Sequence, residues 1–453
     1  MEPIWAILIL LVLMVIGVPV AWSFAGVLMF LVWAYDVNTA TFLLQGFRSL
    51  DSVILLALPL FVLAGYLMQS GGVARRLIGF MELLVRGRKG GLGAALVLSS
   101  GVFGAISGTA TAAVAAIGTI MVDPLAERGY PRGYTSALLG LSSLLGILFP
   151  PSITLILFGV VTRQSITALF AATILPGVLL MLGLIIFNKI MAKRILPQAT
   201  DGDPAAAAGP AKPALSGVSL SAGTPLSAGD KPSRLQVFIR AVPALSMPVI
   251  ILGGIYGGIF TPTEAAAVAS VIAMLIGFFI YRDMSFARLR DSFISAGETT
   301  GTIILILLFS FMIGRVMVAE GVPQDLTSTV ATITENRILI LLLVNAFLIF
   351  FGMIMDDLSV TVVIAPLFLP LMLANGVDPV HFASIVACSV VIGANSPPVA
   401  PILYMACRIG RVPIHQAVTP ALLMIFWVAL PVMLLVTFVP ALSLFVPRLL
   451  GVY

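Results

Sequence analysis

The sequence predicts an all-α, polytopic membrane protein made of two inverted repeats. Of its 453 residues, 60% are hydrophobic and only 9% are charged, whereas soluble domains carry about 25% charged residues. Apolar runs long enough to cross a bilayer recur along the chain, and we expect about 10 full spans besides two re-entrant helical hairpins. A glycine- and proline-containing motif occurs once in each half. These observations place the chain in a lipid bilayer and divide it into two related units.

Composition excludes several classes of function. The net charge of +5 comes from basic residues in short loops between apolar runs, so it does not indicate nucleic-acid binding. Cys388 and Cys407 are the only cysteines, and both lie in apolar runs, which argues against a disulfide framework or a cysteine metal site. The sequence has no Walker motif and no HExxH motif. We therefore expect neither an enzyme nor a cofactor, and an ion gradient as the energy source.

The first inverted repeat is predicted over residues 1–196, beginning with scaffold helices in 1–69. An acidic Glu2 replaces the basic start of a signal peptide, so the first apolar run is expected to be a retained span. The run 92–122 is too long for one span and has glycines and hydroxyls at its middle, which predicts a hairpin entered from the cytoplasm. The run 134–162 contains a Pro-Pro pair and is predicted to be a broken helix.

A segment of different composition separates the halves. Residues 197–233 are dominated by Ala, Pro, Gly and Ser and contain no aromatic residue. Such a segment cannot bury enough apolar surface to offset the entropy lost on ordering, so we predict a flexible cytoplasmic linker.

The second inverted repeat, 234–453, is predicted to follow the same order of elements. Scaffold helices occupy 237–318, a hairpin entered from outside occupies 338–373, and a Pro-Pro pair interrupts a helix over 380–407. The stretch GYPRGYTSALLGLSSLLGILFPPS aligns without a gap on GVDPVHFASIVACSVVIGANSPPV, with three landmarks in register. The landmarks pair Gly129 with Gly376, Gly146 with Gly393, and Pro150 with Pro397. Chance similarity between two apolar helices would not preserve all three.

Charged residues indicate that the two repeats are inserted in opposite orientations. With both termini outside, 19 of the 24 Lys and Arg residues fall in segments predicted to be cytoplasmic, as the positive-inside rule requires. The segment before the first hairpin is basic, with Arg75 and Arg76, whereas its counterpart in the second half carries Glu320, Asp325 and Glu335. Inverted repeats are typical of secondary transporters.

Helix breaks at membrane depth are costly unless they serve a site. A Pro-Pro pair cannot continue the helical hydrogen-bond ladder, so it frees carbonyl oxygens that suit a small cation such as Na+. Helix N-termini at the same breaks offer N–H groups to an anionic substrate. The alternative is that the small residues there only allow close helix packing. The four predicted breaks lie in Gly104–Ala113, Leu141–Ser152, Gly352–Thr361 and Cys388–Val399.

Several polar residues allow two interpretations. Asp356 and Asp357 are either functional acids within the membrane or solvated carboxylates at a hydrated hairpin tip. Glu264 follows two threonines at a helix start, so we expect it to cap the helix and not to bind an ion. Arg315 is expected to extend to the membrane interface, the alternative being attraction of an anionic substrate. His381 lies near the end of a predicted span and is expected at the interface.

Three long motifs resemble the signatures of one known family. GAISGTATAAVAAIGTIMVDPLAERGYPRGYTSALLGLSSLLGILFPPSI, GGIYGGIFTPTEAAAVA and VDPVHFASIVACSVVIGANSPPVAP occur in this order and cover much of both halves. They are similar to the large membrane subunit of tripartite ATP-independent periplasmic (TRAP) transporters of the C4-dicarboxylate permease type. The resemblance implies an elevator-type fold in a bacterial inner membrane, with hairpins and broken helices moving against a scaffold.

The same resemblance implies partners and an ion. A small four-helix membrane subunit and a periplasmic substrate-binding protein would complete the system. Uptake in this family is driven by Na+, and the substrates are small organic anions, namely carboxylates or sulfonates. Selectivity would then reside in the binding protein, so this chain does not reveal its substrate.

Carried over by position, the family's ion sites fall at the predicted breaks. The first Na+ site would involve Ser107, Gly108, Ser143, Gly146 and Pro150. The second would involve Asp356, Gly393, Ser396 and Pro397. We expect no other metal, and place the substrate beside Thr109, Thr111, Ser152, Ser359 and Asn395. The family usually has Asp, Asn and Thr where this chain has Ala113, Ser389 and Ser396, which leaves the number and identity of the coupled ions open.

Two other functions stay open from the sequence. One is an autonomous secondary carrier or antiporter of related fold that needs no partner. The other is a channel, which would conduct without saturating as the substrate concentration rises.

Overall fold

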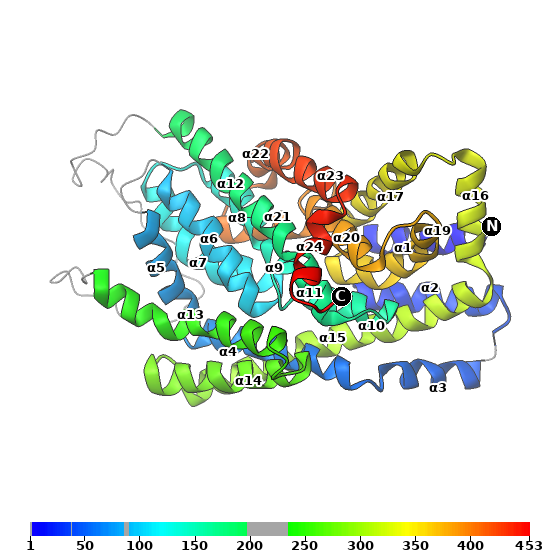
Figure 1. Ribbon diagram of the computed structural model, residues 1–453, viewed down its shortest axis with the longest axis horizontal. Coiled ribbons are helices and arrows are strands. Elements are labelled where there is room, and N and C mark those ends of the chain that lie inside the picture. The colour runs from blue at the N-terminus through cyan, green and yellow to red at the C-terminus, as the bar shows by residue number, and fades with distance from the viewer. Residues whose placement is uncertain (1, 38, 86–89, 197–233) are drawn as a thin grey trace.

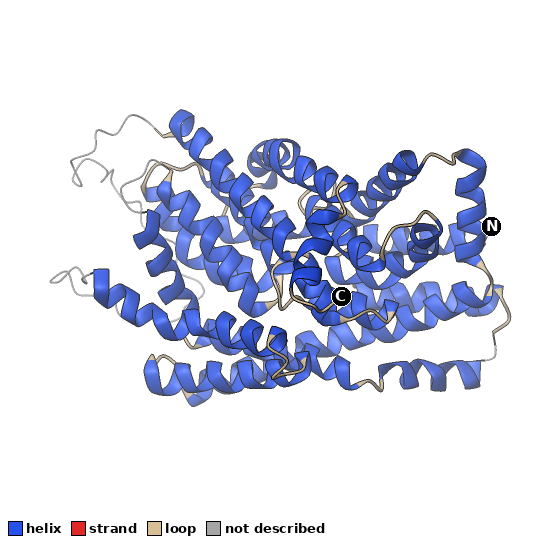
Figure 2. Cartoon of the chain, viewed as in Figure 1, coloured by secondary structure: helices blue, strands red, loops and turns tan. Residues whose placement is uncertain are grey.

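The computed structural model describes residues 2–37, 39–85, 90–196 and 234–453. Over these residues the chain is helical, with loops between the helices and no strand (Figure 2). The predicted linker at 197–233 lies outside the described residues.

The first half contains twelve α-helices and one 3-10 helix, η1, among its described residues. Their bounds are α1 (Glu2–Val15), α2 (Val20–Ala34), α3 (Thr39–Leu50), η1 (Val53–Leu56), α4 (Ala57–Ser70), α5 (Val73–Val85), α6 (Gly91–Ser107), α7 (Ala110–Glu127), α8 (Arg132–Ser143), α9 (Leu145–Leu148), α10 (Ile153–Thr162), α11 (Ile166–Ala172) and α12 (Ile174–Ile195).

The second half has the same helical character, with three π-helical turns, η2, η3 and η4. Its elements are α13 (Arg234–Tyr256), α14 (Pro262–Leu275), η2 (Ile276–Ile280), α15 (Phe286–Ala319), α16 (Val322–Ile333), α17 (Arg337–Gly352), α18 (Asp357–Ser359), η3 (Val360–Ile364), α19 (Ala365–Ala374), α20 (Pro379–Gly393), α21 (Pro401–Gly410), α22 (Ile414–Met424), η4 (Ile425–Ala429), α23 (Leu430–Phe438) and α24 (Ala441–Leu449).

Helix length and composition make this a multi-pass membrane protein. In the described part of the chain, 8 helices are long and apolar enough to cross a membrane. The number rises to 9 if Arg132–Leu148 and Ile153–Thr162, which meet at a bend of 43°, form one span. Five further apolar helices are shorter, at 10–17 residues. The expected count of about 10 full spans stays a prediction.

The segments predicted as scaffold pack together on one side of the molecule. Helix α4 packs against α14 and α15, and α15 also contacts α2 and α3. In Figure 1, α3, α4 and α14 follow the lower edge, and α15 runs above them. Because α15 has 34 residues, it extends for about 51 Å. One helix therefore reaches regions of the molecule that lie far apart.

The hairpins and broken helices of the two halves interdigitate. Helix α8 of the first half contacts α21 and α22 of the second, and α20 contacts α9, α10 and α11. The π-helical turn η3 contacts α10. The interruptions of both halves therefore lie in one packed body, with part of each half completing the surroundings of the other.

In the first half, glycine and proline set the helix ends. Helix α6 ends at Ser107, and Gly108 follows with a φ of 68°, a left-handed conformation that favours glycine after a helix. Thr109 then caps α7 by accepting a hydrogen bond from the third helical nitrogen. Helix α9 ends before the Pro-Pro pair, whose nitrogens cannot donate, and α10 restarts after Ser152.

The second half is interrupted at matching places. Helix α17 ends at Gly352, and the chain resumes helical structure at Asp357. Helix α20 ends at Gly393, and α21 begins only at Pro401, after the second Pro-Pro pair. In both Pro-Pro pairs the peptide bond between the two prolines is cis.

Candidate functional site

Each hairpin packs against the broken helix of its own half through a pair of glycines. A Cβ added to Gly104 of α6 would lie 2.5 Å from the Cα of Gly146 in α9. A Cβ added to Gly393 of α20 would lie 2.6 Å from the Cα of Gly352 at the end of α17. Both contacts are backbone against backbone, so only glycine fits. Gly146 and Gly393 are paired landmarks of the sequence repeat, and Gly104 and Gly352 lie one residue away from the same offset.

The tip of the first hairpin is also fixed to the break after α9. The carbonyl oxygen of Gly108 accepts a hydrogen bond of 3.2 Å from the backbone nitrogen of Ile153. A Cβ on Gly108 would lie 2.7 Å from the carbonyl oxygen of Pro151. On its other side the tip meets the scaffold, because a Cβ on Gly65 of α4 would lie 3.4 Å from the Cβ of Ser107. Ser107, Gly108, Gly146 and the break after Pro150 are thus brought together.

Several hydroxyls assigned to ion or substrate binding already have a local hydrogen-bond partner. The Ser143 hydroxyl donates to the carbonyl oxygen of Gly140 at 2.7 Å, and that of Ser396 donates to the carbonyl oxygen of Ile392 at 2.8 Å. Thr109 and Ser152 accept from backbone nitrogens as helix caps. A hydroxyl that donates to a carbonyl keeps its lone pairs, so the Ser143 and Ser396 oxygens can still bind a cation.

Thr111 and Pro397 differ from the other assigned residues. The Thr111 side chain is exposed on the first turn of α7, and Pro397 lies in the loop between α20 and α21. Ala113, at the position where an acid was expected, is fully buried in α7. The first tip therefore has no carboxylate at that position.

Asn395 is the most unusual polar residue near the breaks. Its side chain is 0% exposed, and within the described residues neither its amide oxygen nor its amide nitrogen has a hydrogen-bond partner. It lies against α8 of the other half, because a Cβ on Gly140 would be 2.6 Å from the Asn395 Oδ1. A buried amide without partners costs free energy. An unpaired amide therefore lies at the junction of the two halves.

The two neighbouring aspartates have different partners. Asp356 accepts from the Ser359 hydroxyl within the same hairpin. Asp357 accepts a hydrogen bond of 2.7 Å from the Thr154 hydroxyl of α10, in the other half. Thr154 was not predicted, since a threonine in an apolar run carries no signal of a partner about 200 residues away. The Thr154–Asp357 pair joins the second hairpin to the first broken helix.

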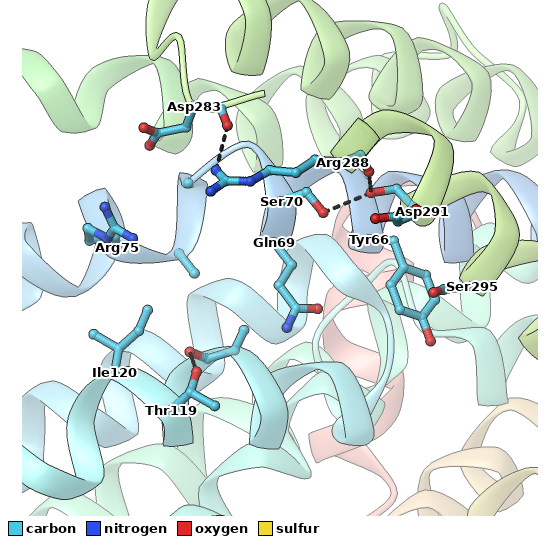
Figure 3. A pocket seen from close by; sticks show the side chains of 14 residues that line it. Tyr66, Gln69, Ser70, Arg75, Thr119, Ile120, Asp283, Arg288, Asp291 and Ser295 are labelled. Atoms are coloured by element: carbon cyan, nitrogen blue, oxygen red, sulfur yellow. Dashed lines mark hydrogen bonds between the residues drawn. The ribbon is translucent and has the colours of Figure 1, made fainter. Parts of the chain in front are cut away.

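Two cavities lie near opposite ends of α15, beside the packed hairpins and broken helices. The smaller, about 440 Å³, lies between α4, α7 and the first turns of α15, and its lining includes Tyr66, Gln69 and Thr119 (Figure 3). The larger, about 1010 Å³, lies between α3, the end of α10 and the last turns of α15. In the lining of the smaller cavity, the Tyr66 hydroxyl is hydrogen-bonded to that of Thr299 of α15 at 2.9 Å. None of the assigned ion or substrate residues lines either cavity.

The structure bears on three further residues, and it confirms the interpretation of one of them. Glu264 and Thr261 form a reciprocal capping box at the start of α14, so the capping role is confirmed. His381 is buried within the protein, at 1% exposed, and its Nε2 is 2.9 Å from the carbonyl oxygen of Val436, while its expected position at the membrane interface stays a prediction. The contact with Val436 shows that helix α23 covers the His381 side chain. Arg315 lines the larger cavity.

Comparison with known proteins identifies the family. The model of the DctM component of tripartite ATP-independent periplasmic transporters matches residues 7–442. The isethionate TRAP transporter permease protein DctMQ of Oleidesulfovibrio alaskensis is 32% identical over 437 residues, which are 95% of this chain and 64% of that protein. This chain therefore spans less than two thirds of that relative.

Two other relatives match over nearly their full length. The C4-dicarboxylate large permease DctM of Pseudomonas aeruginosa is 34% identical over 94% of this chain and 93% of its own. The sialic acid large permease SiaM of Vibrio cholerae is 30% identical over 96% of this chain and 95% of its own.

The fold resembles a solved transporter. The YdaH transporter of Alcanivorax borkumensis superposes with a TM-score of 0.56 at 12% identity, over 87% of this chain and 86% of that one. At this identity the likeness concerns the fold alone. The family match and the relatives, independently of this fold likeness, show that this chain is a membrane transport protein and not an enzyme, and that it belongs to the DctM family of TRAP transporter large permeases.

Proposed function

We propose that this chain moves a small organic anion inward together with Na+, by an elevator motion of the hairpins and broken helices against the scaffold. The observation that carries the proposal is the pair of Gly-Gly contacts, Gly104–Gly146 and Gly352–Gly393, each of which joins a hairpin to the broken helix of its own half. Contacts of α20 with α9 and α10 then bring the two halves together. Interrupted helices of inverted repeats are the usual place where transporters hold ions and substrate. We propose that residues 1–196 and 234–453 are these two repeats, with both termini periplasmic in a bacterial inner membrane.

The substrate class follows from the relatives. Their names refer to isethionate, C4-dicarboxylates and sialic acid. These molecules share a carboxylate or sulfonate group, so we assign a small organic anion to this chain. The DctMQ relative, which is longer than this chain, supports a separate small membrane subunit as a partner. A periplasmic binding protein would deliver the anion.

The Na+ sites are proposed at the two Gly-Gly contacts. In the first half the ligands would come from Ser107, Gly108, Ser143 and Gly146 beside Pro150. In the second they would come from Asp356, Gly393 and Ser396 beside Pro397. The supporting observation is that these residues offer hydroxyl, carboxylate and carbonyl oxygens where helices end, and hard oxygen ligands suit Na+. The substrate would lie between the sites, beside Thr109, Thr111, Ser152, Ser359 and Asn395.

The test is uptake by proteoliposomes that contain this chain, its small subunit and the binding protein. Succinate, isethionate and N-acetylneuraminate are the labelled probes, each with its own binding protein. We expect uptake to require an inward Na+ gradient and the binding protein. Uptake without the binding protein would identify an autonomous carrier, and a non-saturating current would identify a channel.

Two variants test the ion sites. Ser107→Ala and Asp356→Ala should each raise the Na+ concentration that gives half-maximal uptake by about tenfold, because each removes one oxygen ligand. Thr302→Ala is the control, since its exposed hydroxyl only bonds the carbonyl oxygen of Glu298. Unchanged Na+ titrations in both site variants would remove the assignment.

A further inference from the structure

The larger cavity is lined on one side by the scaffold and on the other by elements that would move against the scaffold. Helices α3 and α15 supply Gln45, Ser49 and Ser310 from the scaffold side. The end of α10 supplies Arg163, and the returning arm of the second hairpin supplies Val362. A molecule in this cavity would touch the scaffold, the helix that starts at the first Pro-Pro break and the second hairpin together.

The cavity is electropositive. Its lining includes Arg163 and Arg315, two of the five arginines outside the predicted cytoplasmic segments, and one acid, Glu320. Within the described residues, neither arginine forms an ion pair with a carboxylate. Two guanidinium groups that face a cavity without a carboxylate partner attract anions from solution.

A buried hydroxyl supplies an independent sign of a ligand. Ser310 is 3% exposed, lines this cavity, and its oxygen has no hydrogen-bond partner among the described residues. An unpaired buried hydroxyl costs free energy unless something in the cavity satisfies it. Gln45, Ser49 and Gln164 add further amide and hydroxyl groups to the same lining. The side chains therefore suit a carboxylate or sulfonate that also carries hydroxyl groups.

Arg163 is placed by the backbone. It is the residue after α10 and has a φ of 56°, a left-handed conformation that residues other than glycine rarely adopt. Helix α10 begins at the first Pro-Pro break, so any movement of that break would carry Arg163 with it. Arg315 belongs to α15 of the scaffold. The two positive charges thus lie on different parts of the proposed elevator.

We infer that this cavity is an outer vestibule in which Arg163 and Arg315 hold the anionic group of the substrate before it reaches the breaks. The inference rests on the proposed anion uptake and adds the residues that attract the anion. The same charges would also bind the phosphate of an anionic lipid, so the experiment separates a soluble carboxylate or sulfonate from a lipid.

The first measurement reads the electrostatic potential without needing transport. Gln45→Cys places a thiol on the cavity wall. Both native cysteines are buried, so the wild-type protein gives the background rate of modification. The rate constants for an anionic and a cationic methanethiosulfonate reagent give a ratio that reports the local charge. We expect Arg163→Gln or Arg315→Gln to lower the anionic-to-cationic ratio at least about threefold, and the double variant about tenfold.

The matched control is Arg337→Gln. Arg337 is an exposed arginine at the start of α17, also predicted to be outside, and it does not line the cavity. Arg163 and Arg315 are also exposed, so the control differs from them in lying outside the cavity lining. Removing Arg337 should change the ratio less than about twofold, because salt screens charges beyond roughly 10 Å. A ratio that falls equally in the control, or does not fall in the cavity variants, overturns the inference.

The second measurement identifies the occupant. Succinate or isethionate should slow the anionic reagent at Gln45→Cys, and Arg163→Gln/Arg315→Gln should abolish this protection. The same reactions are run in phosphatidylcholine vesicles with and without phosphatidylglycerol. If phosphatidylglycerol slows the reagent while the soluble anions do not, the cavity is a lipid site and the vestibule is refuted.

Uptake separates this inference from the proposed function. In the complete system, Arg163→Gln and Arg315→Gln should each raise the half-saturating concentration of loaded binding protein several-fold at an unchanged maximal rate. If wild-type protein shows no Na+-driven uptake while the protection persists, the proposed function fails and the anion site stands. If uptake is normal in both variants and protection is absent, only the vestibule fails.

Discussion

The contact between Gly393 and Gly352 gives the sharpest prediction about how the second hairpin is held. In Gly393→Ala, the new Cβ would lie 2.6 Å from the Gly352 Cα, 2.7 Å from the Gly352 carbonyl carbon and 2.8 Å from the carbonyl oxygen of Ile349. All three atoms are backbone, so no side chain can rotate away. Since carbon atoms pack at about 3.5–4.0 Å, α17 and α20 must separate by about 1 Å.

The magnitude follows from two opposing effects. Inserting a methyl group into a close-packed contact costs about 1–3 kcal/mol. Replacing glycine by alanine in a helix returns up to about 1 kcal/mol. Because the new methyl group meets only backbone atoms, the cost lies at the upper end of that range, and we expect Gly393→Ala to lose about 2 kcal/mol of stability. Transport should fall further than stability, because the displaced residue lies immediately before the break at Ser396 and Pro397.

The assay compares apparent melting temperature and uptake in purified, reconstituted protein. Gly301→Ala in α15 is the control, because a Cβ at Gly301 meets nothing within 4 Å and should leave the protein as stable as wild type or slightly more so. Gly104→Ala makes the same test in the first half, where the Cβ would lie 2.5 Å from the Gly146 Cα. If Gly393→Ala melts and transports like Gly301→Ala, the close helix contact does not exist.

Three other substitutions test separate contacts. Thr154→Val keeps the shape but removes the hydrogen bond to Asp357, and should cost about 1–2 kcal/mol in a melting assay. Burial raises the pKa of the Glu82 carboxyl, with Arg128 opposing, so the folded state disfavours the charged form. Glu82→Gln should therefore melt higher than wild type at pH 8, with the gain disappearing as the pH falls through the raised pKa. Arg76→Gln loses an ion pair and a ring contact at 4.3 Å, and should speed hydrogen exchange in α5 several-fold.

Each substitution has a matched control that keeps the chemistry but lacks the contact. Equal effects in a variant and its control would contradict the corresponding contact, and a Glu82→Gln gain that grows as the pH falls would contradict the sign of the pKa shift. The controls are Thr302→Val for Thr154→Val, Glu320→Gln for Glu82→Gln, and Arg75→Gln for Arg76→Gln, all at exposed positions. Arg75 lies in the same helix as Arg76 and has no ion pair within the described residues.

Local sequence signals accounted for the class of protein and for the places where helices stop. Low charge predicted a membrane protein, and Gly108 and the two Pro-Pro pairs predicted interruptions that the helix ends match. These signals work because they depend on a residue and its near neighbours: proline has no N–H, and glycine alone favours positive φ. The capping by Glu264 followed for the same reason.

Contacts between distant residues were decided only by the tertiary structure. The Thr154–Asp357 hydrogen bond, the unpaired amide of Asn395 and the burial of His381 all depend on elements from other parts of the chain. The cavity with Arg163 and Arg315 likewise forms between helices that are far apart in sequence. Apolar periodicity determines which residues leave water but not which helix they meet, because many apolar faces are interchangeable until the whole bundle packs.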